Sequence, residues 1–313
     1  MKNILSMKIY LFAFAFMAYF VSYAQQDPQY SQYMFNMVNV NPGYAGSRNV
    51  LSLVALHRNQ WMNVDGAPKT SSFTADMPIC NNKWGIGLSF VNDKIGRFNS
   101  NTFNVFAAYR LKTDSKGTLG MGLTAGANML RAQLSDIRSN PQGLSETLFQ
   151  DFTKTSPVLG VGFFYNRDRW YLGISAPSLL SNNESKYTKN NSVLRKFHHF
   201  FLMGGYVLKM SEEVKLKPSF MLKGVAGGPM AVDLNLNVWL HDIVSLGASY
   251  RVQNALVAMI EVQATKELRF GYAMDYPTTD FKNSKGSTPL THEFLLRYEF
   301  GIQKKKIIAP RYF

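Results

Sequence analysis

Nine charged side chains that alternate with apolar residues are the groups in this chain with the most evident capacity for chemistry. A pair of carboxylates could act as acid and base in hydrolysis, provided that burial or a neighbouring charge shifts their pKa values. Charges of both signs that share an enclosed space more often form salt bridges, which rigidify a fold or line water. We therefore expect a salt-bridge network among Arg110, Asp233, Arg251, Glu261, Arg269, Asp275, Glu293, Arg297 and Glu299.

The other reactive side chains form no recognisable catalytic or metal-binding motif. The sequence has no Gly-x-Ser-x-Gly, P-loop or HExxH motif, and Cys80 is its one cysteine, so an internal disulfide and a cysteine-based metal cluster are excluded. Glycines at 120, 122, 160 and 162 lie within strand-like segments, where they more plausibly give room to crowded neighbours than cradle a phosphate. No metal-ligand spacing with acidic partners occurs at His57, His198, His199, His241 or His292. We expect a protein that is not an enzyme and uses no metal or cofactor.

The elements that must position the nine charges are strands, because apolar and charged residues alternate along them with a period of two. The segment from Thr291 to Phe300 has apolar and aromatic residues on one face and mostly charged residues on the other. Residues 232–241, 102–112 and 268–276 behave alike. A soluble sandwich also alternates in this way, so one strand alone does not distinguish it from a membrane barrel.

Turn signals divide the chain into 14 predicted strands, and the lengths of the links between them show a parity. Links after even-numbered strands are short, whereas the long links at 130–156, 177–197 and 277–289 all follow odd-numbered strands. A barrel with both termini in the periplasm has short turns at one end and long loops at the other, and a sandwich gives no reason for such parity. We predict an all-β fold, a 14-stranded antiparallel transmembrane β-barrel. The strands are expected near residues 48–58, 69–77, 83–92, 101–112, 117–129, 157–166, 169–176, 198–208, 214–223, 230–240, 243–251, 255–264, 268–276 and 290–301.

Whether such a barrel is open depends on the side chains that fill it. A barrel of eight strands is already filled by side chains, and a wider one can enclose a lumen. The lumen of this barrel is predicted to receive the side chains of Phe106, Phe163, Trp239 and Met259.

The start of the chain predicts export. Basic residues precede an apolar run from Ile9 to Val21, and Ser22 and Ala24 make a small-x-small cleavage site before Gln25. We expect a signal peptide at residues 1–24, a periplasmic N-terminal segment at 25–47 and an outer-membrane barrel with a C-terminal tail at 48–313.

The net charge of +14 is consistent with an anionic partner. Nucleic acid is the usual partner of a strongly basic protein, and export argues against it. We expect the basic loops to face outer-membrane lipid and lipopolysaccharide, or acidic partners.

A short amphipathic helix is predicted ahead of the first strand. Asp27 suits an N-cap and Pro28 the first helical position. One helical face would carry Tyr30, Tyr33, Met34 and Met37. The helix is expected to pack on the periplasmic mouth of the barrel; a plug or a docking element is the alternative.

Several motifs give the chain a resemblance to a known family. The stretches DPQYSQYMFN, NPGYAG, RNQW with GAP, and the terminal PRYF are similar to those of the PorP/SprF family, outer-membrane proteins of the type IX secretion system in Bacteroidetes. The residues that carry the resemblance are Asp27, Pro28, Gln29, Tyr30, Ser31, Gln32, Tyr33, Asn41, Pro42, Tyr44, Ala45, Gly46, Arg58, Gln60, Trp61, Gly66, Ala67, Pro68, Pro310, Arg311, Tyr312 and Phe313.

The resemblance implies a 14-stranded outer-membrane barrel that supports type IX secretion and anchors a large secreted adhesin by its type B C-terminal domain. It further implies periplasmic secretion components as partners and, for some members, a role in gliding motility; the cargo stays unidentified. Aromatic residues dominate interface hot spots, so candidate loop contacts for the cargo are Trp61, Tyr187, Phe197 and Phe281. The alternative function is a passive channel or a transporter of hydrophobic solutes.

Overall fold

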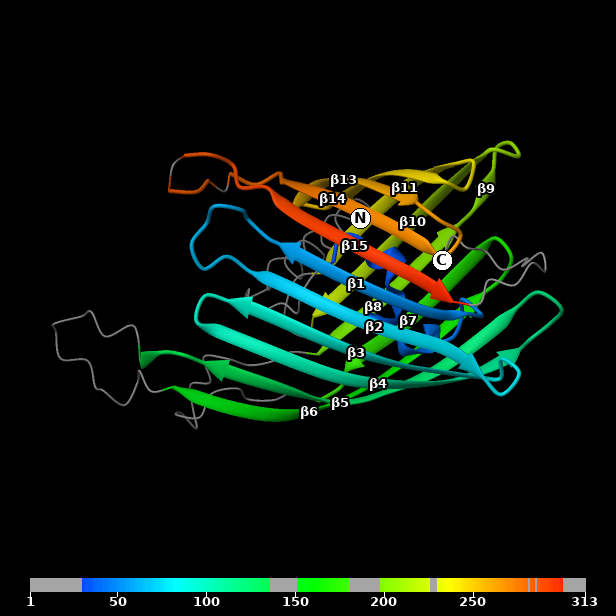
Figure 1. Ribbon diagram of the computed structural model, residues 1–313, viewed down its shortest axis with the longest axis horizontal. Helices are drawn as coiled ribbons and strands as arrows, with labels where there is room; N and C mark the ends of the chain where they lie inside the picture. Colours follow the sequence, from blue (N-terminus) through cyan, green and yellow to red (C-terminus); the bar gives the residue numbers. More distant parts are fainter. Residues whose placement is uncertain are drawn as a thin grey trace, which may run out of the picture.

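The structure of the chain is a computed structural model that describes residues 30–135, 151–180, 198–225, 230–280, 282–284 and 286–300. Antiparallel strands that follow one another along the chain dominate it (Figure 1). The first seven are β1 Leu51–Asn59, β2 Lys69–Ile79, β3 Trp84–Ile95, β4 Phe98–Lys112, β5 Thr118–Ala132, β6 Phe152–Asn166 and β7 Trp170–Ser178. The rest are β8 His199–Tyr206, β9 Leu208–Lys209, β10 Val214–Val225, β11 Ala231–Leu240, β12 Val244–Arg251, β13 Ala255–Gln263, β14 Leu268–Pro277 and β15 Thr291–Phe300.

The sheet closes on itself, because β1 pairs with β15 in a register that sets Leu51 opposite Phe300. Segments β8 and β9 are two parts of one strand, since both pair with β10 and are separated only by Val207. The wall therefore has 14 strands, and the prediction of a 14-stranded antiparallel barrel is confirmed. Closure leaves no unpaired edge strand, which is the requirement for a sheet that crosses a lipid bilayer.

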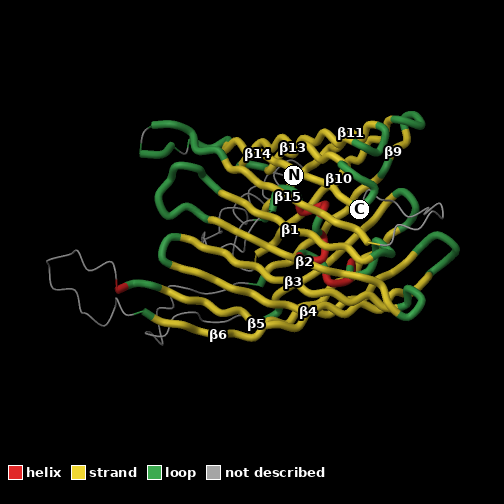
Figure 2. The backbone as a smooth tube through the Cα atoms, viewed as in Figure 1, coloured by secondary structure: helices red, strands yellow, loops and turns green. Residues whose placement is uncertain are grey.

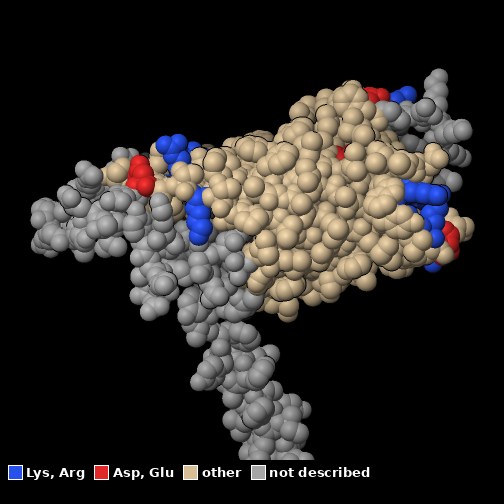
Figure 3. Space-filling model, turned by 90° about the horizontal axis from the view of Figure 1, so that it is seen from below, with Lys and Arg blue, Asp and Glu red and all other residues tan. Residues whose placement is uncertain are grey.

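Alternation along the strands sorts side chains between the outer face and the lumen. Strand β13 shows it most simply, because buried and exposed residues alternate from Ala255 to Val262. Large apolar side chains such as Phe103, Leu256 and Phe294 are exposed on the outer face. On the face shown in Figure 3, Lys, Arg, Asp and Glu gather at the two ends of the barrel and leave an uncharged band between them. Such a band suits the hydrocarbon core of a membrane.

One inward residue was predicted on the wrong face. Phe163 is 48% exposed on the outer face, and the neighbouring Phe164 is 1% exposed inside the barrel. Residues 158–164 are apolar or glycine at nearly every position, so alternation carries little information there. Phe106, Trp239 and Met259 point inward as predicted.

The links preserve the predicted parity with altered bounds. Short turns at 80–83, 113–117, 167–169, 210–213, 241–243 and 264–267 define one end of the barrel, which we call the short-turn end. The opposite end, which we call the long-loop end, carries the links at 60–68, 133–151, 179–198 and 278–290. The predicted loop at 130–156 is shorter because β5 and β6 continue to pair as far as Ala132 and Phe152.

The predicted N-terminal helix is a series of three short 3₁₀ turns, η1 Tyr33–Phe35, η2 Met37–Asn39 and η3 Pro42–Tyr44. It has no solvent-exposed face, because the residues around Tyr33, Met34 and Met37 are buried as well. Figure 2 shows these turns within the tube of strands. Within the described residues, no helix is long and apolar enough to cross a membrane.

Candidate functional site

The candidate site is the contact between the N-terminal segment, residues 30–50, and the inner wall of the barrel. The expected position at the periplasmic mouth is wrong, and the segment lies inside the lumen, as the alternative of a plug predicts. It begins near Asp275 and Glu293 at the long-loop end and reaches Glu299 at the short-turn end through Arg48. Its apolar side chains join one buried cluster with wall residues from β1, β4, β6, β7, β8, β10, β11, β13, β14 and β15. Burial of its apolar side chains against most of the strands is the physical reason for its position.

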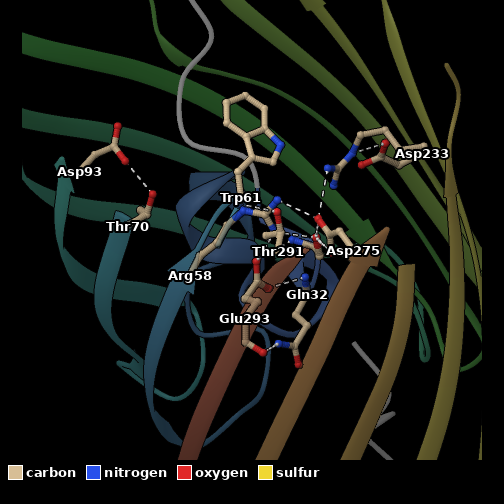
Figure 4. A network of polar contacts seen from close by, with 11 residues as sticks. Gln32, Arg58, Trp61, Thr70, Asp93, Asp233, Asp275, Thr291 and Glu293 are labelled. Atoms are coloured by element: carbon tan, nitrogen blue, oxygen red, sulfur yellow. Dashed lines mark hydrogen bonds and ion pairs between the residues drawn. The ribbon is translucent and has the colours of Figure 1, made fainter. Parts of the chain in front are cut away.

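Glu293 holds the beginning of the segment. Its carboxylate accepts hydrogen bonds from the backbone N–H groups of Ser31 and Gln32, at 2.9 and 2.7 Å. The Gln32 side-chain amide also donates to the Glu293 carbonyl oxygen at 3.3 Å. One side chain of β15 therefore satisfies two successive backbone donors of a segment with little secondary structure of its own (Figure 4).

Arg58 of β1 connects this anchor to β14. Its guanidinium donates to the Ser31 hydroxyl at 2.8 Å, to Glu293 at 3.0 Å and to Asp275 at 2.7 Å. The Ser31 hydroxyl in turn donates to Asp275 at 2.7 Å. Arg251 extends the network, since it pairs with Asp233 at 3.1 Å and lies 3.7 Å from Asp275. Figure 4 shows these side chains converging from β1, β14 and β15 on the N-terminal segment.

A second charged network lies nearer the short-turn end. Glu261 of β13 accepts from Arg297 at 2.6 Å and from Arg269 at 3.2 Å. Glu299 pairs with Arg48 of the N-terminal segment through the arginine Nε at 2.6 Å. Arg297 also lies 3.4 Å from Glu299, so it joins the two acids. The paired charges tie β13, β14 and β15 to the segment inside them.

Aromatic contacts fill the space between the two networks. The Phe35 ring meets Trp239 edge-on at 6.3 Å, and Tyr44 meets Phe164 edge-on at 5.1 Å. The Tyr33 hydroxyl accepts a hydrogen bond from Asn235 at 2.6 Å. The middle of the lumen is thus packed like the core of a soluble protein.

Glycines in the wall allow the segment to lie against the strands. A Cβ atom on Gly122 would come within 2.2 Å of the Pro42 carbonyl carbon, and one on Gly162 within 2.2 Å of Asn41 Oδ1. Gly120 meets the Gly43 oxygen in the same way. The interpretation that the glycines give room to crowded neighbours is confirmed, and at these three positions the neighbour is the N-terminal segment. At Gly160 the neighbour is Pro177, whose oxygen an added Cβ would meet at 2.4 Å.

Several expected site residues line the link at 60–68. Gln60 donates its N–H to the Pro68 oxygen at 3.0 Å, and Gly66 accepts from Gly96 at 2.9 Å. Trp61 is half-buried and has a positive φ of 50°. Its backbone N–H donates to the Thr291 hydroxyl at 3.1 Å. These residues hold the rim of the long-loop end, and Trp61 borders the first charged network through Thr291, which lies opposite Asp275 (Figure 4).

The remaining expected residues divide into three groups. Asn41, Pro42, Tyr44, Ala45 and Gly46 belong to the buried segment, and Arg110 of β4 donates to Asn49 at 3.0 Å. Ala67 donates its N–H to the Val64 oxygen in the link at 60–68. The signal peptide and the residues Asp27, Pro28, Gln29, Tyr187, Phe197, Phe281, Pro310, Arg311, Tyr312 and Phe313 lie outside the described residues.

Sequence reasoning missed three buried charged residues of the wall, Asp76, Lys217 and Lys223. Asp76 accepts a hydrogen bond from the Gly46 N–H at 2.8 Å. Alternation with the inward Ser72 and Thr74 could have identified Asp76, and alternation along β10 could have identified both lysines. Among the described residues there is no group of three or more His, Cys, Asp and Glu side chains that could hold a metal ion.

A family model matches most of the chain, and several solved structures resemble it distantly. A family model described as type IX secretion system membrane protein PorP/SprF matches residues 22–298. No curated protein matches the chain. Among the solved structures, the outer membrane protein Omp33 of Acinetobacter baumannii is 10% identical, with 80% of this chain and 98% of that chain covered and a TM-score of 0.48. The Ralstonia pickettii toluene transporter TbuX is 8% identical, with 84% and 93% covered and a TM-score of 0.48. At these identities the likeness extends to the fold alone.

Proposed function

Because the chain belongs to the PorP/SprF family of type IX secretion system membrane proteins, we propose that it holds a large secreted adhesin at the cell surface. The adhesin is retained through its type B C-terminal domain, and gliding motility or adhesion is the process that it serves. The family match identifies the barrel as an outer-membrane component associated with type IX secretion. Periplasmic secretion components, outer-membrane lipid and lipopolysaccharide are further partners under this proposal.

The packed lumen is the observation that carries the proposal. Residues 30–50 cross the lumen and bury their side chains against nearly every part of the wall. When residues 30–50 fill the lumen, a partner can contact only the rim and the loops of the barrel. The packed segment also holds the rim and the loops in a defined arrangement. The same packing counts against a passive channel or a solute transporter, because the middle of the lumen is occupied by aromatic side chains.

The rim at the long-loop end is suited to hold a partner. The backbone N–H of Trp61 donates to the Thr291 hydroxyl, and the backbone N–H of Met62 donates to the Leu290 carbonyl oxygen at 2.8 Å. Two loops that lie far apart in the sequence are thereby fixed to each other. Trp61 is the described aromatic residue of this rim that we assign to the cargo contact, since aromatic anchors dominate interface hot spots.

Deletion of the gene for this barrel tests the proposal. One large adhesin should disappear from the cell surface, whereas other type IX cargo is secreted normally; normal display of all adhesins would overturn the proposal. Trp61→Ala should weaken retention of the adhesin about tenfold or more, the loss expected for a hot-spot residue. Trp84→Ala is the matched control, because Trp84 is an exposed tryptophan at the opposite end of the wall.

A further inference from the structure

A row of cations crosses the outer face of the wall at the long-loop end of β2–β5. The strand register sets Lys69 opposite Lys94, Lys94 opposite Asn99, and Asn99 opposite Arg131. Directly opposite residues of antiparallel strands have Cβ atoms about 4.5–5.5 Å apart. Lys69, Lys94 and Arg131 are all exposed, and together we call them the cationic row.

The carboxylates nearest to the row are engaged elsewhere. Asp93 turns to the opposite face, where it accepts a hydrogen bond from the Thr70 hydroxyl at 2.6 Å. Asp151 accepts a hydrogen bond from the Ser135 N–H at 2.9 Å, which is the main reason that its pKa is lowered, and the charge of Arg131 contributes least. Among the described residues, neither Lys69 nor Lys94 forms an ion pair with a carboxylate. Like charges directly opposite each other destabilise a sheet, so an anion bound between the two lysines would be stabilising.

Below the row, the same face becomes polar and then aromatic. The side-chain amide of Asn92 donates to Asn99 Oδ1 at 2.7 Å and to Asn101 Oδ1 at 2.8 Å, which fixes an amide platform next to the cations. Two residues further along the strands, Phe73, Phe90 and Phe103 lie side by side in register and are all exposed. Lys94 and Phe90 are four residues apart, which is about 13 Å along a strand.

In the part of the wall that the structure describes, the row lies on one side of the barrel. Among the described residues at the long-loop end of strands β7–β14, the large outward side chains are apolar: Leu179, Met230, Val252 and Tyr276 are all exposed. On the face shown in Figure 3, basic side chains occur at the ends of the wall and are absent from the band between them. A cationic row over one sector therefore differs from a charged belt that surrounds the whole barrel.

We propose that the cationic row binds the phosphate groups of an outer-leaflet glycolipid whose acyl chains lie against Phe73, Phe90 and Phe103. Lysine and arginine form charge-assisted hydrogen bonds with phosphate oxygens. A ligand that is anionic at one end and apolar at the other matches the whole surface, whereas a soluble anion or an acidic protein would leave the aromatic rings uncovered. The inference rests on the outer-membrane placement of the barrel and is independent of the cargo.

Bisphosphorylated lipid A is the probe for this site. The folded protein, purified in mild detergent, is titrated with lipid A, and binding is followed by native mass spectrometry. The triple variant K69Q/K94Q/R131Q should lose at least about tenfold in affinity, since each exposed ion pair contributes modestly and three act together. The control variant K83Q/K112Q/K266Q removes the same charge from exposed positions at the short-turn end and should change affinity less than about twofold.

Two further arms identify the ligand chemistry. Dephosphorylated lipid A should bind the wild-type protein no better than it binds the triple variant, and an excess of inorganic phosphate should not displace bound lipid A. Equal affinity in the two triple variants, or undiminished binding of the dephosphorylated lipid, would overturn the proposal. Complete displacement by inorganic phosphate would also overturn it, because the site would then hold a free anion. Surface display of the adhesin is scored separately, so failure of this site leaves the anchor proposal testable.

Discussion

Glu293 shows how one residue can decide the arrangement of a long segment. Its buried carboxylate accepts two backbone N–H groups and pairs with Arg58 at 3.0 Å. A buried charge is tolerated only when it is paired and fully hydrogen-bonded. Removing the carboxylate would leave both the Arg58 charge and the two backbone donors without this partner.

We expect Glu293→Ala to lower the free energy of unfolding by about 3–5 kcal/mol, the usual effect of breaking a buried ion pair. Glu293→Gln keeps an acceptor without the charge and should cost about 1–3 kcal/mol. Urea unfolding of the barrel in lipid vesicles measures both. Glu212→Ala, an exposed glutamate in the short turn at 210–213, should change stability by less than about 0.5 kcal/mol. Equal effects at the two positions would show that Glu293 does not anchor the segment.

The N-terminal segment is an element whose structure depends on its surroundings. Its 3₁₀ turns contain three residues each, too few to be stable alone. The segment fits because the wall next to it lacks side chains at Gly120, Gly122 and Gly162. The strands and the N-terminal segment therefore form one packed unit. A larger side chain in the wall would displace the segment.

Gly122→Ala tests this dependence. The added Cβ would meet the Pro42 carbonyl carbon at 2.2 Å, and such overpacking typically costs about 1–3 kcal/mol. The variant should unfold at lower urea concentration and should show ion conductance in planar bilayers, whereas we expect none from the wild-type barrel because its lumen is packed. Gly224→Ala is the control, because its added Cβ has its nearest neighbour at 4.0 Å. A silent Gly122→Ala variant of wild-type stability would refute the proposed packing.

At the scale of the whole molecule, the parity of the links predicts the orientation in the membrane. Outer-membrane barrels have short turns on the periplasmic side and longer loops outside. Cys80 is a free, exposed cysteine in the link at 80–83, which belongs to the short-turn end. The native chain thus carries its own probe of orientation.

A membrane-impermeant maleimide should leave Cys80 unlabelled on intact cells and should label it once the outer membrane is permeabilised. The matched probe is Asp65→Cys in a Cys80→Ser background, which places a cysteine at an exposed position of the long-loop end. That variant should react on intact cells. Labelling of Cys80 from outside would reverse the assignment of the two ends.

The strand order and the outer face of the barrel follow from the sequence itself. Alternation is a property of the local backbone, so Thr291–Phe300 could be recognised as a wall strand without any partner. Local reasoning worked less well where both faces of a strand are apolar, as at Phe163 and Phe164. It also placed the inward charges on the correct strands without showing which acid meets which base.

The contents of the lumen were decided by the tertiary structure alone. The contacts of Ser31 with Asp275 and Glu293 join residues that lie 244 and 262 positions apart in the sequence. Periodicity reports which way a side chain points, and it carries no information about which distant segment it meets. Closure of the sheet brings β1, β14 and β15 together, and only then does an enclosed space exist for residues 30–50 to fill.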